Sequence, residues 1–426
     1  MRVLAKQKSN SLILDFIPDA DDRLVPTEKY SMAKRRCEFH LPNGFSLEEL
    51  HADHLGLVCI MLCFPFVGSN LLLPKPISEK FYQSTKVVSR FNIGPVDESI
   101  EPYIATLDSR PALAFSGGVD SVAALAIMPE DTVCVFLDRP IRKGSLYDKE
   151  APIEICKGFM TLGREVYMIH SDLEYLRSPI GFPVDVANSA PAVLLSELLS
   201  FKSIAFGTIS ESAYGLGHKK YRDYPNGNHY RTWGSMFKGA GIPLNLTVAG
   251  LSEVATSKII IDAGLSNLSQ SCIRGKIGEP CRNCWKCFRK ILLDTVLRGN
   301  KITDKVLDEM FTIKEAIHHL KGFPIKHENV LTYITSKYNG DHLLMNLLKK
   351  RVRGDKLQLS WLECWNSESA MILHPSSKEH VIQSILEIVD EMDEKTRLLM
   401  RNWDMTEMLE SPEYIKLKDQ LIEHLS

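Results

Sequence analysis

The sequence predicts an α/β protein built around a parallel sheet, and three features of the chain support this prediction. Short apolar runs at 112–115, 132–137, 165–170 and 203–207 are typical of buried strands. Segments with a helical pattern lie between them, at 119–128, 152–162 and 190–199. The first run passes into its helix through a Ser-Gly-Gly turn. Strands that alternate with helices favour parallel pairing, with helices on both faces of the sheet.

The carboxyl ends of these strands are the expected ligand-binding edge, because open parallel sheets bind ligands beyond that end. We therefore expect the loops after Phe115, Leu137, His170 and Gly207 to share one active-site mouth.

The sheet-forming domain is predicted to cover residues 101–295, with one further region on either side. Residues 1–100 form an α+β region of unknown role, with strands at 11–16 and 36–40 and helices at 46–64 and 78–92. Residues 296–426 are mostly helical, and Ser376-Ser-Lys-Glu379 is a capping-box pattern before an apolar helical stripe. Both flanking regions are candidate binding regions for partner proteins, and the sequence leaves the oligomeric state open.

The composition is that of an ordinary globular protein. Of its 426 residues, 44% are hydrophobic and 24% are charged, and the net charge of −2 gives no general attraction to nucleic acid or to an anionic membrane. The apolar stretch 55–73 is interrupted by Pro65 and Gly68, so we expect a buried helix that ends near Phe66 and no membrane span. The first residues contain no apolar segment typical of a secretory signal. We expect a cytoplasmic protein with reduced thiols.

The most informative segment is the glycine loop, residues 116–121, which reads Ser-Gly-Gly-Val-Asp-Ser. Its glycines let backbone N–H groups turn toward a ligand, and the N-terminus of the following helix adds partial positive charge. An anion such as phosphate therefore fits at this turn. The loop lacks the Gly-Lys-Ser/Thr ending of a Walker P-loop.

A second signal is a group of four cysteines, Cys272, Cys281, Cys284 and Cys287. Their spacing, Cys-x8-Cys-x2-Cys-x2-Cys, suits tetrahedral thiolate coordination of zinc in a structural site. An iron–sulfur cluster is the alternative, because thiolates serve both. Six basic side chains in this segment are expected to offset the thiolate charge: Arg274, Lys276, Arg282, Lys286, Arg289 and Lys290.

The glycine loop resembles the Ser-Gly-Gly-x-Asp-Ser loop of the PP-loop ATP pyrophosphatases, a superfamily with an adenine nucleotide alpha hydrolase-like fold. Together with the cysteine spacing, it is similar to the 7-cyano-7-deazaguanine synthases (QueC), in which a zinc segment follows the last strand. Weaker matches lie between the two signals, at Gly207-Thr208, Tyr214-Gly215, Tyr221-Arg222-Asp223 and Lys258-Ile259. The resemblance covers less than half of the chain.

The resemblance implies cleavage of ATP to AMP and pyrophosphate, with Mg²⁺, in order to adenylate a carboxylate that an amine or ammonia then attacks. Asp120 and Lys258 are the implied catalytic residues. Nucleotide contacts are implied for Ser116, Gly117, Gly118, Val119, Asp120, Ser121, Asp138 and Gly207. A polar loop after the fourth strand is the candidate substrate region, with Glu211, Tyr214, His218, Lys219, Arg222 and Asp223.

The chain also departs from QueC in ways that bear on the substrate. The family's Tyr-Pro-Asp-Cys-Arg segment is not intact at 214–224, and residues 1–100 and 296–426 are additional. This layout is more similar to the enlarged QueC-like proteins of bacterial anti-phage systems, or to the glutamate epimerase MurL. Carboxylate substrates thus include a 7-deazaguanine acid, another small molecule or a protein.

Two alternatives of other kinds remain open from the sequence. An RNA-modifying enzyme of the thiolation type would need a reactive cysteine outside the cluster, and Cys134 and Cys156 lie in segments expected to be buried. The basic runs 34–36 and 349–353 are candidate RNA contacts, although such runs are more often solvated faces. A nucleotide-binding scaffold subunit without turnover is the second alternative.

Overall fold

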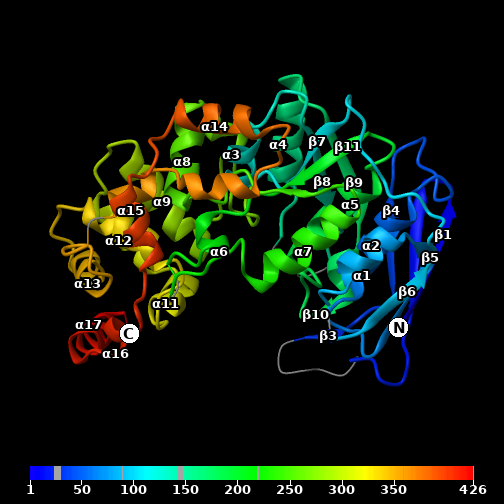
Figure 1. The fold of residues 1–426 in the computed structure, drawn as a ribbon. Helices are drawn as coiled ribbons and strands as arrows, with labels where there is room; N and C mark the ends of the chain where they lie inside the picture. The colour runs from blue at the N-terminus through cyan, green and yellow to red at the C-terminus, as the bar shows by residue number, and fades with distance from the viewer. Residues whose placement is uncertain (24–29, 89, 143–146, 218–219, 358, 426) are drawn as a thin grey trace.

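A computed structural model describes residues 1–23, 30–88, 90–142, 147–217, 220–357 and 359–425. Its centre is a ten-stranded, mostly parallel sheet in the order β12-β11-β7-β8-β9-β4-β2-β1-β5-β6 (Figure 1). The first five strands in this order are all parallel: β12 (Leu244–Asn245), β11 (Phe201–Ala205), β7 (Arg110–Phe115), β8 (Val133–Asp138) and β9 (Val166–Ser171). The α/β class and the four predicted strands are confirmed.

Alternate residues of the central strands face opposite cores, which explains their uninterrupted apolar sequence. On β7, Ala112 and Ala114 belong to one buried cluster, whereas Leu113 and Phe115 belong to another. The first cluster includes side chains of α1 (Ala52–Cys63), α5 (Ala190–Leu194) and α7 (Asn228–Gly239). The second includes side chains of α3 (Val119–Ile127), α4 (Glu150–Thr161), α8 (Glu253–Asp262) and α14 (Lys378–Leu386). Both faces of the sheet are therefore covered.

Residues of the N-terminal region extend the same sheet. Its strands are β1 (Arg2–Lys8), β2 (Ser11–Ile17), β4 (Arg36–His40), β5 (Asn70–Ile77) and β6 (Asn92–Val96). Strand β4 pairs antiparallel with β9, through Phe39 with Ser171 and His40 with His170. Two short strands, β3 (Ser31–Met32) and β10 (Arg177–Ser178), pair separately.

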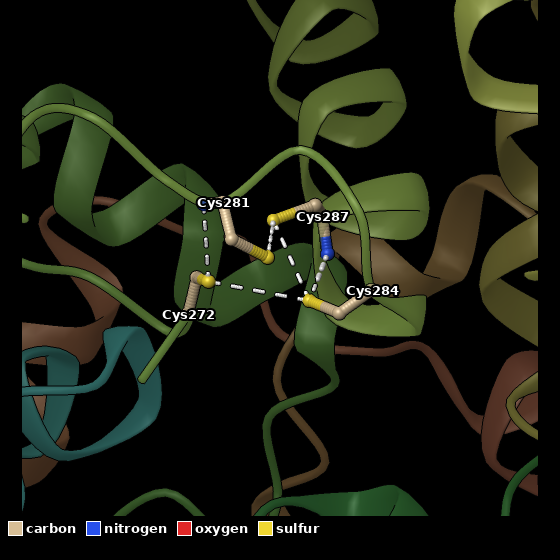
Figure 2. Close-up of side chains that lie close together, drawn as sticks. All are labelled: Cys272, Cys281, Cys284 and Cys287. Atoms are coloured by element: carbon tan, nitrogen blue, oxygen red, sulfur yellow. Dashed lines mark hydrogen bonds between the residues drawn. The ribbon is translucent and has the colours of Figure 1, made fainter. Parts of the chain in front are cut away.

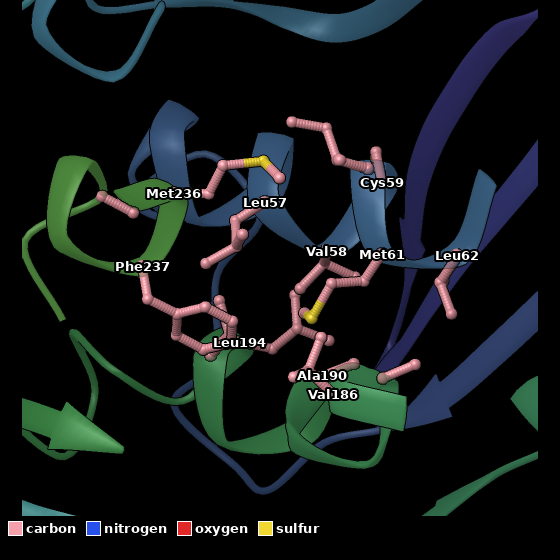
Figure 3. Packing of buried hydrophobic residues seen from close by; sticks show 14 of the residues in the cluster. Leu57, Val58, Cys59, Met61, Leu62, Val186, Ala190, Leu194, Met236 and Phe237 are labelled. Atoms are coloured by element: carbon pink, nitrogen blue, oxygen red, sulfur yellow. The ribbon is translucent and has the colours of Figure 1, made fainter. Parts of the chain in front are cut away.

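Helix α1 confirms that a buried helix ends before Phe66, although it begins at Ala52 and not at residue 46 as predicted. It packs in the core that joins the N-terminal and central residues. Figure 3 shows its side chains beside those of 3₁₀ helix η2 (Asp185–Ser189), α5 and α7. No helix among the described residues is long and apolar enough to cross a membrane. The helix expected at 78–92 is shorter, because α2 (Glu79–Thr85) ends early and Asn92 begins strand β6.

The remaining helices confirm the helical character of the C-terminal region. They are α9 (Trp285–Leu297), α10 (Asp304–Phe311), α11 (Lys314–Leu320), α12 (Glu328–Ser336), α13 (Leu343–Arg351), α15 (Glu394–Arg401), α16 (Thr406–Glu410) and α17 (Pro412–His424). Most of them share a core of their own. Short elements complete the fold: α6 (Ser210–Ala213), η1 (Leu173–Leu176), η3 (Ser266–Leu268), η4 (Ser360–Glu363) and η5 (Ser367–Ile372). The prediction of a capping box at 376–379 is wrong. The Ser376 hydroxyl forms a hydrogen bond with His374, and the residue at the N-cap of α14, Ser377, makes no side-chain capping bond.

Candidate functional site

The glycine loop connects the carboxyl end of β7 to the first turn of α3, in the middle of the parallel strands. Gly117 has a φ of +71°, a conformation that glycine adopts without strain. The hydroxyl oxygens of Ser116 and Ser121 lie 3.0 Å apart, and Ser121 Oγ donates to the Gly118 carbonyl at 3.0 Å. The N–H groups of the first turn of α3 have no partner within the helix, so the loop is a suitable anion site.

A cavity of about 730 Å³ opens against this loop. Ser116, Gly118, Asp120 and Ser121 line it, together with Gly207 after β11. Phe136, Leu137 and Pro152 form an apolar part of its wall, which suits a flat aromatic ring. Three of the four strand ends that we expect at one site, those at Phe115, Leu137 and Gly207, therefore line this cavity. His170 is not part of the lining.

Gly207 allows β11 to approach the glycine loop closely. A Cβ atom at this position would lie 2.8 Å from the Ser121 amide nitrogen and 3.0 Å from the Asp120 carbonyl carbon. Both neighbours are backbone atoms, so no side-chain rotation could relieve the contact. Only glycine leaves the loop in its observed place.

Asp120 and Lys286 place opposite charges in the wall of the cavity. Asp120 Oδ1 accepts a hydrogen bond of 2.9 Å from Thr256 Oγ1 of α8, which orients the carboxylate. The Lys286 side chain is exposed and lines the cavity. Desolvation by the neighbouring protein lowers the pKa of Lys286, and the Asp120 carboxylate acts in the opposite direction. Lys286 follows Cys284 by two residues, and the sequence predicts for it only a role in offsetting the charge of the four cysteines.

Lys258 and Asp138, two of the predicted site residues, are not in the cavity lining. Lys258 Nζ lies 3.7 Å from a Glu363 carboxylate oxygen and lines a different cavity. Asp138 is at the end of β8, where it accepts hydrogen bonds from Lys149 at 2.9 Å and pairs with His170 at 3.2 Å. Helix α8 therefore contributes Thr256, and not Lys258, to the surroundings of the glycine loop.

Glu211 is buried in a polar network between the central sheet and the C-terminal helices, away from the cavity lining. Its carboxylate accepts hydrogen bonds from Asn329 Nδ2 at 2.8 Å and from the Glu253 amide at 3.1 Å. Burial, together with the charge of Glu253, raises the pKa of Glu211 to about 7. Burial alone would also raise the pKa of Glu253, but the cations of Arg289 and Lys290 hold it below its ordinary value.

Of the other residues in the predicted substrate loop, some line the cavity and one is buried in the core. Arg222 and Asp223 line the cavity, and their contact with a substrate stays a prediction. Tyr214 is buried and stacks on Tyr221, with ring centroids 5.8 Å apart. His218 and Lys219 lie outside the described residues.

The four cysteines form one cluster at the start of α9 (Figure 2). All four Sγ atoms lie within 4.8 Å of one another, and three pairs are 3.5, 3.8 and 4.0 Å apart. A tetrahedral zinc with Zn–S bonds of about 2.3 Å requires S–S distances of about 3.8 Å. The cluster therefore fits a metal ion such as zinc with four thiolate ligands.

Backbone amides, more than basic side chains, surround these sulfur atoms. The amides of Cys281, Asn283 and Cys287 each donate to a cysteine Sγ at 3.4 Å. Five of the six expected cations instead pair with carboxylates: Arg274 with Glu315, Lys276 with Glu150, Arg282 with Glu309, and Arg289 and Lys290 with Glu253. Arg274 also interacts electrostatically with Cys281 and Cys284, and the role of the six cations in offsetting the thiolate charge stays a prediction.

Comparison with known proteins adds one family match. Residues 232–404 match a family of unknown function (DUF6395). The matched range contains the cysteine cluster and Lys286 and does not include the glycine loop. No curated protein matches the chain.

Proposed function

We propose that this chain is a QueC-like ATP pyrophosphatase that adenylates a carboxylate. The observation that carries the proposal is the glycine loop at the carboxyl end of β7, opening α3 and facing a cavity of about 730 Å³. The loop is suited to the pyrophosphate end of ATP, and the apolar wall near Phe136 is suited to the nucleoside. The PP-loop resemblance supports the same orientation.

The proposed reaction has two steps. A carboxylate oxygen of the acid attacks the α-phosphorus of ATP, and the bond to the pyrophosphate oxygen breaks. An amine or ammonia then attacks the acyl carbon, and AMP leaves with the electron pair of the C–O bond. Catalysis of such phosphoryl chemistry depends mainly on positioning and on neutralising charge.

Three groups would supply this positioning. The amides of the glycine loop would hold the pyrophosphate, and Lys286 would neutralise part of its charge. Asp120 is the proposed Mg²⁺ ligand, since Thr256 occupies one of its oxygens and leaves lone pairs on the other. When bound, Mg²⁺ would supply positive charge to offset that of the phosphate groups. The cysteine cluster would hold a structural zinc that keeps the start of α9, and with it Lys286, beside the cavity.

The thiolation alternative is disfavoured by the remaining cysteines. Burial raises the pKa of all six thiols outside the cluster, and it raises those of Cys134 and Cys156 to about 12. Sulfur transfer requires a thiolate that is accessible and ionised near neutral pH. A carboxylate therefore remains the preferred class of substrate. A 7-deazaguanine acid is the first to test, and a role in anti-phage defence is the biological context that the resemblance suggests.

The test measures Mg·ATP binding by calorimetry and pyrophosphate release with a panel of carboxylic acids that includes a 7-deazaguanine acid. We expect Asp120→Ala and Ser121→Ala to reduce both. Ser109→Ala is the matched control, because Ser109 is buried just before the opposite end of the same strand. An absence of ATP binding by the unmodified protein would overturn the proposal. Binding without pyrophosphate release for any acid would favour the scaffold alternative.

A further inference from the structure

A second polar cluster lines the same cavity and has no role in the reaction described so far. Asp185 begins 3₁₀ helix η2, Tyr224 lies in the loop before α7, and His229 is in the first turn of α7. His229 Nε2 lies 2.7 Å from Asp185 Oδ2, and His229 Nδ1 lies 3.1 Å from Tyr224 Oη. The imidazole thus connects a carboxylate to a phenol hydroxyl.

The chemistry of the three groups determines where their protons are. An ionised carboxylate only accepts hydrogen bonds, so Nε2 of His229 carries a hydrogen and donates it to Asp185. In the neutral imidazole Nδ1 is then an acceptor, and Tyr224 Oη donates to it. Burial raises the pKa of Tyr224, which keeps this hydroxyl protonated near neutral pH. The Tyr224 oxygen retains lone pairs that could accept a proton from a molecule in the cavity.

We propose that Tyr224, His229 and Asp185 form a proton relay for the nucleophile that displaces AMP. As the amine nitrogen bonds to the acyl carbon and AMP leaves, the amine proton passes to Tyr224 Oη. Tyr224 gives its own proton to His229 Nδ1, and Asp185 stabilises the imidazolium. In this inference, which rests on the proposed function, Tyr224 is the catalytic residue and the other two are positioning residues.

The relay makes a prediction that needs no knowledge of the acid. The probe 5′-(4-fluorosulfonylbenzoyl)adenosine carries a sulfonyl fluoride on an adenosine that would occupy the nucleotide part of the cavity. Attack by Tyr224 Oη forms an O–S bond and breaks the S–F bond, fluoride leaves, and the phenol proton goes to His229. We expect peptide mass spectrometry to find the label on Tyr224, and we expect ATP to protect against it.

Variants then separate a relay from a merely structural cluster. His229→Phe should slow the labelling of Tyr224 by roughly tenfold or more, since acid–base assistance is worth at least that much. Asp185→Asn should slow the labelling of Tyr224 by a smaller factor than His229→Phe does. Asp185→Glu keeps the carboxylate, so this variant should be labelled faster than Asp185→Asn. Thermal melting and Mg·ATP affinity report whether each variant folds. Tyr230→Phe is the control, because Tyr230 packs against Tyr224 with ring centroids 5.7 Å apart and is not part of the cavity lining.

Two results would overturn the relay while leaving ATP binding intact. One is labelling of Tyr224 at an unchanged rate in a folded His229→Phe variant. The other is a protein that binds Mg·ATP but is not labelled at Tyr224, which would mean that the oxygen does not face the nucleotide. Failure of the unmodified protein to bind Mg·ATP would instead refute the proposed function itself.

Discussion

Replacement of Gly207 by alanine should displace the glycine loop. The added Cβ would lie 2.8 Å from the Ser121 amide nitrogen, whereas ordinary contacts begin at 3.4 Å, so one of the two backbone segments must move by about 0.6 Å to reach ordinary contact. The three nearest neighbours of this Cβ are backbone atoms, and the two segments directly follow the adjacent parallel strands β11 and β7. Overpacking of this kind costs about 1–3 kcal/mol of unfolding free energy.

The effect on ligand binding should exceed the effect on stability. A misplacement of about 1 Å in a positioned site costs on the order of 10²-fold in activity. Because the shift here is somewhat smaller, we expect Mg·ATP affinity to fall by about tenfold or more. The assay is calorimetric titration with the α,β-methylene analogue of ATP, combined with urea denaturation to measure the free energy of unfolding.

Gly234→Ala is the matched control for this experiment. Gly234 lies within α7, where the three side-chain atoms nearest to an added Cβ belong to the ring of Tyr230, the first of them at 3.3 Å, and that side chain can move. If Gly207→Ala unfolds at the same urea concentration as the unmodified protein and binds the analogue equally well, the close approach of β11 to the loop is not what positions the site.

Three further predictions concern the metal, the cation and the buried carboxyl. Elemental mass spectrometry of the purified protein should find about one zinc ion per chain. The Cys284→Ser variant should lose this zinc, whereas Cys364→Ser, which lies outside the cluster, should keep it. Iron in place of zinc would indicate an iron–sulfur cluster. Lys286→Met should weaken Mg·ATP binding by about tenfold, whereas Lys258→Met, in another cavity, should change it little. The pKa of Glu211, about 7 in the folded protein, is above its ordinary value of 4.5, so this group stabilises the fold at low pH and the contribution is lost as pH rises through 7. Denaturation at about pH 5 and about pH 8 should show a loss of up to roughly 3 kcal/mol that Glu211→Gln abolishes, and an equal loss in the variant would assign the pH dependence to other groups.

Much of the central fold could be predicted because its signals are local. Residues 112–115 of β7 and 133–137 of β8 each face an apolar core on one side of the sheet or the other, so both strands appear as unbroken apolar runs. The two-residue strand β12 carries no such run and was missed. The antiparallel pairing of β4 with β9 was also missed, because pairing between segments far apart in the chain leaves no local pattern.

The candidate site also has parts that the sequence predicts and parts that it does not. The sequence by itself determined the glycine loop and the cysteine cluster, because their residues are close together in the chain and spacing alone limits their geometry. Only the tertiary structure decided which distant side chains meet the loop: Thr256 and Lys286 do, whereas Lys258 pairs with Glu363 and Glu211 is buried. The physical reason is that neighbouring side chains on a helix point in different directions. One helix, α8, therefore directs Thr256 toward Asp120 and Lys258 toward a separate cavity.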